Sequence, residues 1–96
     1  MNITDVRVRI VRSSEKIKGI ASITLDDCFV VHDIKIVEGT NGLFVGMPAR
    51  KGEDGVFRDI AHPIEPETRQ QLSEKVLNRY YEVLAEEERQ GTEETP

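Results

Sequence analysis

Residues 28–47, CFVVHDIKIVEGTNGLFVGM, decide the fold because they read as two strands joined by a tight turn. The run from Cys28 to Val37 is apolar on both faces at first and then alternates, as expected for a central strand. An Asn-Gly pair ends the turn that follows, and LFVGM returns as the next strand. The stretch therefore predicts a β-hairpin whose first strand lies inside an antiparallel sheet.

The segments before this hairpin also read as strands. Residues 3–11, ITDVRVRIV, place Val6, Val8 and Ile10 on one face and charged side chains on the other, which predicts a half-buried strand. Residues 17–25, IKGIASITL, are rich in β-branched and small side chains, and an Asp-Asp turn separates them from the central strand. After the hairpin, the short run VFRDIA indicates an edge strand or an extended segment.

The period becomes helical at Pro66, which suits the first position of a helix. We expect this helix from about residue 66 to about residue 88, with an acidic, disordered tail at 89–96. Its apolar stripe consists of Leu72, Val76, Tyr80, Val83 and Leu84. The sequence therefore predicts one α+β domain at 1–88, an antiparallel sheet of about five short strands with the helix packed across one face.

Size and composition set further bounds. A domain of 96 residues without tryptophan has a modest core, so a second copy that covers a sheet edge is a reasonable expectation. The single cysteine, Cys28, has no intramolecular disulfide partner, and its apolar surroundings favour a buried small side chain over a reactive thiol. No stretch resembles a signal peptide or a membrane span, which predicts a cytoplasmic protein without membrane contact.

The charge is distributed unevenly. The net charge is −5, which at first argues against a nucleic-acid partner. Residues 64–96 hold four Lys and Arg residues against nine Asp and Glu residues, so this last third accounts for the whole net charge. The first 63 residues are neutral overall and leave room for a local basic surface.

Catalysis has little support in the sequence. His62, Asp59, His32, Asp33 and Cys28 are the groups that acid–base chemistry could use, but their spacing matches no metal-ligand or nucleophile motif. No glycine pattern forms a nucleotide phosphate cradle either. We therefore expect no enzyme, no cofactor and no metal site. His32 is expected to be a structural or surface residue, and His62 is expected to hold a turn, with ligand contact as its alternative role.

The stretch MPARKGEDGVFRDIAHP, residues 47–63, is the candidate binding loop. If KGEDG folds back as a turn, Arg50, Lys51 and Arg58 converge into a cluster suited to phosphate contacts. Possible secondary contributors are Arg7, Arg9 and Lys35. Residues expected to shape the loop are Pro48, Gly55, Asp59, His62 and Pro63.

A charged, solvated turn is the competing interpretation of this loop. Glu53 and Asp54 dilute the cluster, and Asp59 is free to pair with Arg58. Two aromatic side chains near the loop, Phe44 and Phe57, could stack on bases, but a core position is the favoured interpretation of both.

The segments ITDVRVR, ASITLDDCFVVHDIKIVEG, GLFVGMPARK and FRDIAHPI resemble the family of stage V sporulation protein G, the SpoVG septation proteins. The resemblance extends to about Tyr81, and FRDIAHP after MPAR is its most specific part. It implies a small bacterial cytoplasmic regulator, without enzyme activity, that forms homodimers by joining sheets across strands. It also implies binding of DNA, and in some members RNA, with links to sporulation, asymmetric septation and gene expression.

In this family the nucleic-acid contacts are attributed to basic residues around the MP[SA] loop, which correspond here to Arg50, Lys51 and Arg58. Some members carry a longer basic run, whereas this chain has only two adjacent cations before acidic residues. A protein-interaction module of the septation or regulatory machinery, without direct nucleic-acid binding, is the alternative function.

Overall fold

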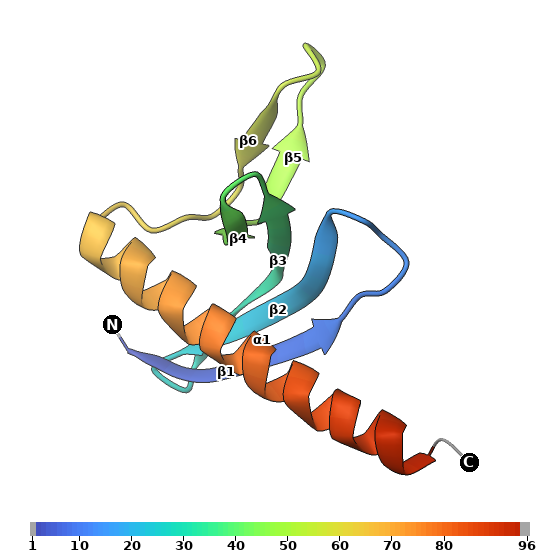
Figure 1. Ribbon diagram of the computed structural model, residues 1–96. Helices are drawn as coiled ribbons and strands as arrows, with labels where there is room; N and C mark the ends of the chain where they lie inside the picture. The colour runs from blue at the N-terminus through green and yellow to red at the C-terminus, as the bar shows by residue number, and fades with distance from the viewer. Residues whose placement is uncertain (1, 95–96) are drawn as a thin grey trace.

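The computed structural model describes residues 2–94, with side chains for residues 2–89. The expected α+β class is confirmed: a four-stranded antiparallel sheet of order β1-β2-β3-β4 carries a single helix across one face (Figure 1). The elements are β1 (Ile3–Ile10), β2 (Ile17–Leu25), β3 (Phe29–Gly39), β4 (Gly42–Gly46), β5 (Ala49–Lys51), β6 (Phe57–Asp59) and α1 (Pro66–Glu94). The sheet face that α1 covers is called the inner face below, and the opposite face is the outer face.

The segment after Met47 differs from the expectation. The sequence predicts a loop there, but Ala49–Lys51 forms β5, which pairs with β6 in a separate two-stranded sheet. The main sheet ends at Gly46 because Pro48, two residues later, has no amide hydrogen to continue the ladder. The chain then turns back on itself, so β6 pairs with β5 instead of joining the main sheet as an edge strand.

The Asp-Asp turn between β2 and β3 takes left-handed backbone angles. Asp26 and Asp27 have φ values of 50° and 55°, and the Cys28 amide donates to the Leu25 carbonyl over 3.0 Å. Aspartate accepts this region more easily than most residues because its short side chain bonds locally. Here the Asn2 amide donates to Asp26 Oδ1 over 2.9 Å, which ties the turn to the start of the chain.

A β-bulge in β3 resets the alternation of that strand. Ala21 pairs with Ile34 and Ile23 pairs with Val31, so two residues of β3 face one residue of β2. Asp33 sits in this bulge with a φ of 62°. Because of the extra residue, Val31 before the bulge and Ile34 after it both face α1. The bulge explains why this strand looks apolar on both faces at first and alternates only later.

The core lies between the inner face and the helix. Its fully buried side chains are Ile34, Ile36 and Val76, and the expected helix stripe is confirmed at Leu72, Val76 and Tyr80. The helix comes close to the sheet over Gly19, where an added Cβ would lie 3.0 Å from Ile36 Cδ1 and 3.3 Å from Tyr80 Cδ1. A side chain at position 19 would therefore require the Ile36 and Tyr80 side chains to shift by a few tenths of an ångström.

The helix is longer than expected and reaches Glu94 rather than ending near residue 88. Glu, Arg and Gln have good helix propensity, and no proline interrupts the segment before residue 96. An ion pair of 2.9 Å between Arg12 Nη2 and Glu87 Oε2 joins the helix to the β1–β2 loop. Residues 95–96 lie outside the described residues, and the division into a domain and a tail stays a prediction.

Three expectations of burial are wrong. Cys28 is exposed because it lies at the end of the β2–β3 turn. Phe44 is 51% exposed because it points to the outer face, which α1 does not cover. Phe57 is 65% exposed because no other helix or strand of the described chain forms a layer on the small two-stranded sheet.

Candidate nucleic-acid interface

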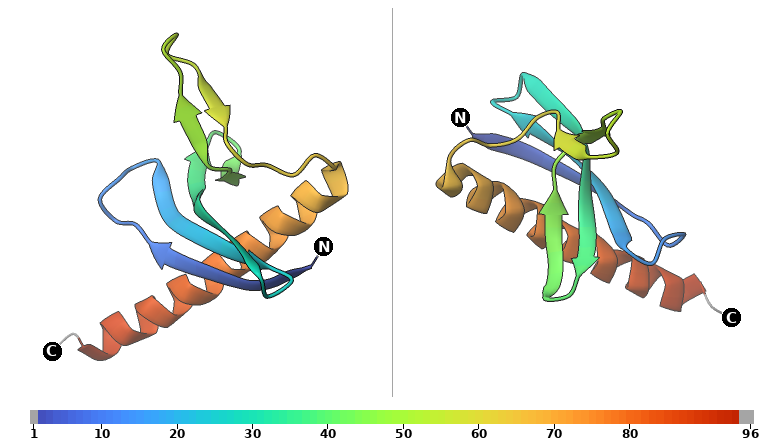
Figure 2. Two further views of the ribbon diagram at one scale, coloured as in Figure 1. Left: turned by 180° about the vertical axis from the view of Figure 1, so that it is seen from behind. Right: turned by 90° about the horizontal axis from the view of Figure 1, so that it is seen from above.

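Residues 48–60, which comprise β5, its turn and β6, form a β-hairpin that we call the arm. The arm projects away from the main sheet and the helix (Figures 1 and 2). At its base the Ile60 amide donates to the Pro48 carbonyl over 2.7 Å, and the preceding Met47 is buried in the core. The arm is therefore anchored at its base while its strands and turn reach into solvent.

The turn of the arm depends on two glycines. The Gly52 amide donates to the Val56 carbonyl over 2.9 Å, and the Gly55 amide donates to the Gly52 carbonyl over 3.0 Å. Gly55 has a φ of +81°, which is the left-handed conformation that closes such a hairpin turn. Gly52 leaves the space that the side chains of Asp54 and Arg58 occupy, because a Cβ there would lie 2.8 Å from both.

The strand register divides the three predicted cations between the two faces of the arm. Arg50 pairs directly with Arg58, so both side chains lie on one face. Lys51 pairs with Phe57 on the other face, where Lys51 Nζ lies 6.0 Å from the centroid of the Phe57 ring. The arm thus brings two arginines together and places the lysine behind them.

Asp54 holds one of the two arginines. Its Oδ2 lies 2.8 Å from Arg58 Nη2 and its Oδ1 lies 3.3 Å from Arg58 Nη1. Oδ1 also accepts a 3.1 Å hydrogen bond from the Val56 amide. The partner of Arg58 is therefore Asp54 and not Asp59, which lies opposite Ala49 on the Lys51 face. Arg50 has no ion-pair partner among residues 2–89 and presents its charge to solvent.

This contact predicts how the arm responds to acid. The hydrogen bonds from Arg58 and the Val56 amide hold the pKa of the Asp54 carboxyl below its ordinary value of 3.8. Because the pKa of Asp54 is lowered in the folded protein, its ionised carboxylate stabilises the arm at pH values above the ordinary pKa. This stabilisation is lost as the pH falls through the lowered pKa. We expect an NMR titration of the Asp54 carboxyl carbon to show a midpoint below 3.8, and a midpoint above 3.8 would contradict the ion pair.

The remaining loop residues lie where the arm returns to the body. The ring nitrogen Nδ1 of His62 donates to the Pro63 carbonyl over 3.0 Å, and His62 is itself exposed. Asp59 is exposed at the end of β6. This short segment connects β6 to the first turn of α1.

The secondary cations lie on the main sheet and not on the arm. Arg9 pairs with Ile20, and Ile20 pairs with Lys35, so these three residues form one row across the outer face. Arg7 lies on the same face, with its Nε 3.1 Å from Asp5 Oδ2. Arg7 and Arg9 also line an outer-face hollow of about 320 Å³. The alternation of β1 predicts that Arg7 and Arg9 share a face. Only the register of β1, β2 and β3 shows that Lys35 lies on the same face.

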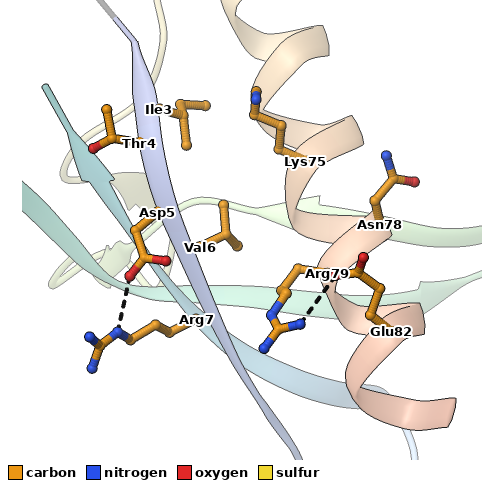
Figure 3. A pocket seen from close by; sticks show the side chains of 9 residues that line it. All are labelled: Ile3, Thr4, Asp5, Val6, Arg7, Lys75, Asn78, Arg79 and Glu82. Carbon is orange, nitrogen blue, oxygen red and sulfur yellow. Dashed lines mark hydrogen bonds and ion pairs between the residues drawn. The ribbon is translucent and has the colours of Figure 1, made fainter. Parts of the chain in front are cut away.

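A cavity of about 480 Å³ is an open groove between β1 and α1 (Figure 3). Most of its charges are already paired: Asp5 with Arg7 on the strand, and Glu82 with Arg79 on the helix at 3.2 Å. Lys75 also lines it. The groove is polar and exposed.

No helix within residues 2–94 has the length and apolar content needed to cross a lipid bilayer. The part of the chain that the structure describes contains no cluster of three or more His, Cys, Asp or Glu side chains arranged to hold a metal ion.

Comparison with known proteins identifies the family. The SpoVG family model matches residues 1–82. A relative from Clostridium perfringens is 55% identical over 83 residues, which cover 86% of this chain and 92% of the relative. A relative from Listeria monocytogenes is 54% identical over 94 residues, which cover 98% of this chain and 92% of the relative. Both relatives carry names that link them to septation. The chain belongs to the SpoVG family.

Proposed function

We propose that this protein is a cytoplasmic regulator, without enzyme activity, that binds DNA or RNA as a homodimer through its arm. The observation that carries the proposal is the arm itself, a two-stranded ribbon that projects from the body with Arg50 and Arg58 side by side. The major groove of B-DNA, about 12 Å wide, admits a two-stranded β-ribbon. A ribbon with arginines on one face suits phosphate contacts at the groove rim and contacts to base edges within it.

The pairing of Arg50 with Arg58 favours an anionic ligand. Like charges directly opposite each other on two strands destabilise the pair. Asp54 relieves this repulsion in part by neutralising Arg58. A phosphate between the two guanidinium groups would relieve it further, because arginine binds phosphate through two parallel hydrogen bonds. A phosphate bound between Arg50 and Arg58 would thus explain why two like charges stand opposite each other.

The homodimer in this proposal uses the unpaired edges of the main sheet. Among the strands of residues 2–94, β1 and β4 each have one neighbour in the sheet order, so each leaves one edge without a partner strand. Exposed edges invite pairing with another copy. A dimer that joins sheets in this way would present two arms to one nucleic acid at a fixed separation. The septation link in the names of the relatives supports a role for such binding in the control of division and gene expression.

The proposal is tested by a salt-titrated binding assay on the purified chain. Duplex DNA, single-stranded DNA and RNA of equal length are compared by fluorescence anisotropy, and the mass of the protein is measured in parallel. Binding that weakens linearly with the logarithm of salt concentration, together with a dimeric mass, supports the proposal. No binding to any of the three at low salt overturns it.

Substituting Asp54 by asparagine is expected to strengthen nucleic-acid binding several-fold. The substitution removes a negative charge from the arm and frees Arg58 for phosphate, which should also steepen the salt dependence by about one phosphate contact. Glu53→Gln is the matched control, because it removes the same charge from the neighbouring residue without releasing an arginine. Equal gains for the two variants would show that Arg58 is not a contact residue.

A protein-interaction module is the second candidate function, and exposed apolar side chains favour it. Val56, Phe57, Ile60 and Ile64 on the arm and the segment after it are between 51% and 89% exposed. Apolar groups gathered on an exposed segment mark many protein-binding surfaces. A pull-down from nuclease-treated lysate separates the two functions. Partners that persist favour direct protein contact, and partners that disappear with the nucleic acid count against it.

A further inference from the structure

An apolar pocket of about 420 Å³ lies at the base of the arm, where the inner face meets the first turns of α1. Its floor is part of the hydrophobic core: Ile23, Met47 and Leu72 are 2%, 8% and 4% exposed. Phe29 from β3 stands at its wall and is 64% exposed. Pockets of this size and apolar lining are typical of small-molecule sites.

The pocket touches both ends of the arm. Met47 immediately precedes the arm, and Ala61, His62 and Pro63 immediately follow it. Thr68 contributes from the first turn of α1. A molecule in the pocket would therefore contact the sheet, both roots of the arm and the helix at once.

The polar groups of the pocket define the chemistry of its ligand. No lysine or arginine lines it among the described residues, whereas Asp26 does. An anionic ligand would therefore find no cation and one repelling charge. His62 supplies a hydrogen-bond acceptor: the Pro63 carbonyl can only accept, so Nδ1 carries the hydrogen and Nε2 of the neutral ring is left to accept.

We propose that this pocket binds a neutral, largely apolar small molecule that donates one hydrogen bond to His62 Nε2. The site is separate from the cations of the arm and does not depend on nucleic-acid binding. A small molecule suits the pocket better than a flat protein surface does, because the pocket is hollowed down to side chains that are almost fully buried. The proposal gives a role to His62, whose ring belongs neither to the core nor to the strands of the arm.

The probe for the test is N-phenyl-1-naphthylamine, a neutral aromatic amine with a single N–H donor that fluoresces in apolar surroundings. Its sulfonated analogue, 8-anilinonaphthalene-1-sulfonate, has the same skeleton with a negative charge. We expect the neutral probe to bind with one site per chain and the anionic probe to bind about tenfold more weakly. Equal affinity for the two probes would contradict the proposed charge selectivity.

Two substitutions and one control variant locate the site. Ala61→Trp fills the pocket from its rim, and Ala85→Trp adds the same side chain to an exposed position of the helix as the matched control. The neutral probe should lose its signal with the first variant and keep it with the second. His62→Leu keeps the pocket apolar but removes the acceptor, so it should weaken the neutral probe about five- to tenfold.

Unchanged probe binding in Ala61→Trp would overturn the proposal, as would equal loss in Ala85→Trp or a lack of effect of His62→Leu. Mass measurements on the same samples identify a competing occupant. If Ala61→Trp converts a dimer to a monomer, or if probe affinity falls as protein concentration rises, a second copy fills the pocket and the small-molecule proposal fails. Circular dichroism confirms that each variant is folded before its result is counted.

Discussion

Replacing Arg50 and Lys51 together by glutamate is expected to weaken nucleic-acid binding by at least about tenfold at moderate salt. Both side chains are exposed on the arm, and neither has an ion-pair partner among residues 2–89, so their charges are available to phosphate. The plot of log affinity against log salt concentration should become shallower by about two phosphate contacts per arm. Fluorescence anisotropy over a salt series measures both quantities.

The control for this experiment is the pair Arg69→Glu and Lys75→Glu on the helix. It makes the same change in net charge at exposed positions away from the arm. If the helix pair weakens binding as much as the arm pair, the effect comes from overall charge and the arm is not the interface. If the arm pair leaves both affinity and salt slope unchanged, nucleic-acid binding through these cations is excluded.

Substituting Ile36 by alanine is expected to lower the free energy of unfolding by about 2–5 kcal/mol. Ile36 is fully buried, and its Cδ1 fills the space beside Gly19 where the helix approaches the sheet. The loss combines the transfer free energy of the removed carbons with the cavity that the packed layers cannot close. A domain of this size has a total stability of the order of 5–15 kcal/mol, so the variant should be close to unfolding at 37 °C. Urea denaturation monitored by circular dichroism measures the change.

Ile64→Ala is the matched control, because Ile64 is 89% exposed. It should change the unfolding free energy by less than about 0.5 kcal/mol, as is usual for surface positions. If the two variants lost similar stability, the inner face would not be the centre of the core. The comparison also tests the direction in which β3 turns its side chains after the bulge.

The sequence predicts the main sheet and the helix well because both follow a simple period. Alternation in residues 5–10 and helical spacing from Pro66 onward record directly which side chains face the core. The arm does not follow from such a period. β5 has only three residues, ARK, and nothing in their hydrophobicity shows that they pair with residues 57–59. That pairing depends on the glycine turn, whose geometry becomes clear only in three dimensions.

The candidate site shows the same limit. The sequence identifies Arg50, Lys51 and Arg58 as neighbours and predicts that all three converge. It also leaves Asp59 as the candidate ion-pair partner of Arg58. Strand register separates Lys51 from the two arginines, and the turn brings Asp54 to Arg58. The hydrophobicity of Phe57 predicts that it is buried, but it does not reveal that no described element covers the arm.

The bulge at Asp33 makes one residue of this strand dispensable to the core. Before the bulge the odd-numbered residues of β3 face the helix, and after it the even-numbered residues do. A chain without Asp33 would form a regular strand in which Phe29, Val31, Ile34 and Ile36 still alternate onto the inner face. Removing Lys35 instead would turn Ile36 outward. The fold therefore tolerates the loss of a residue from β3 at Asp33 but not at Lys35.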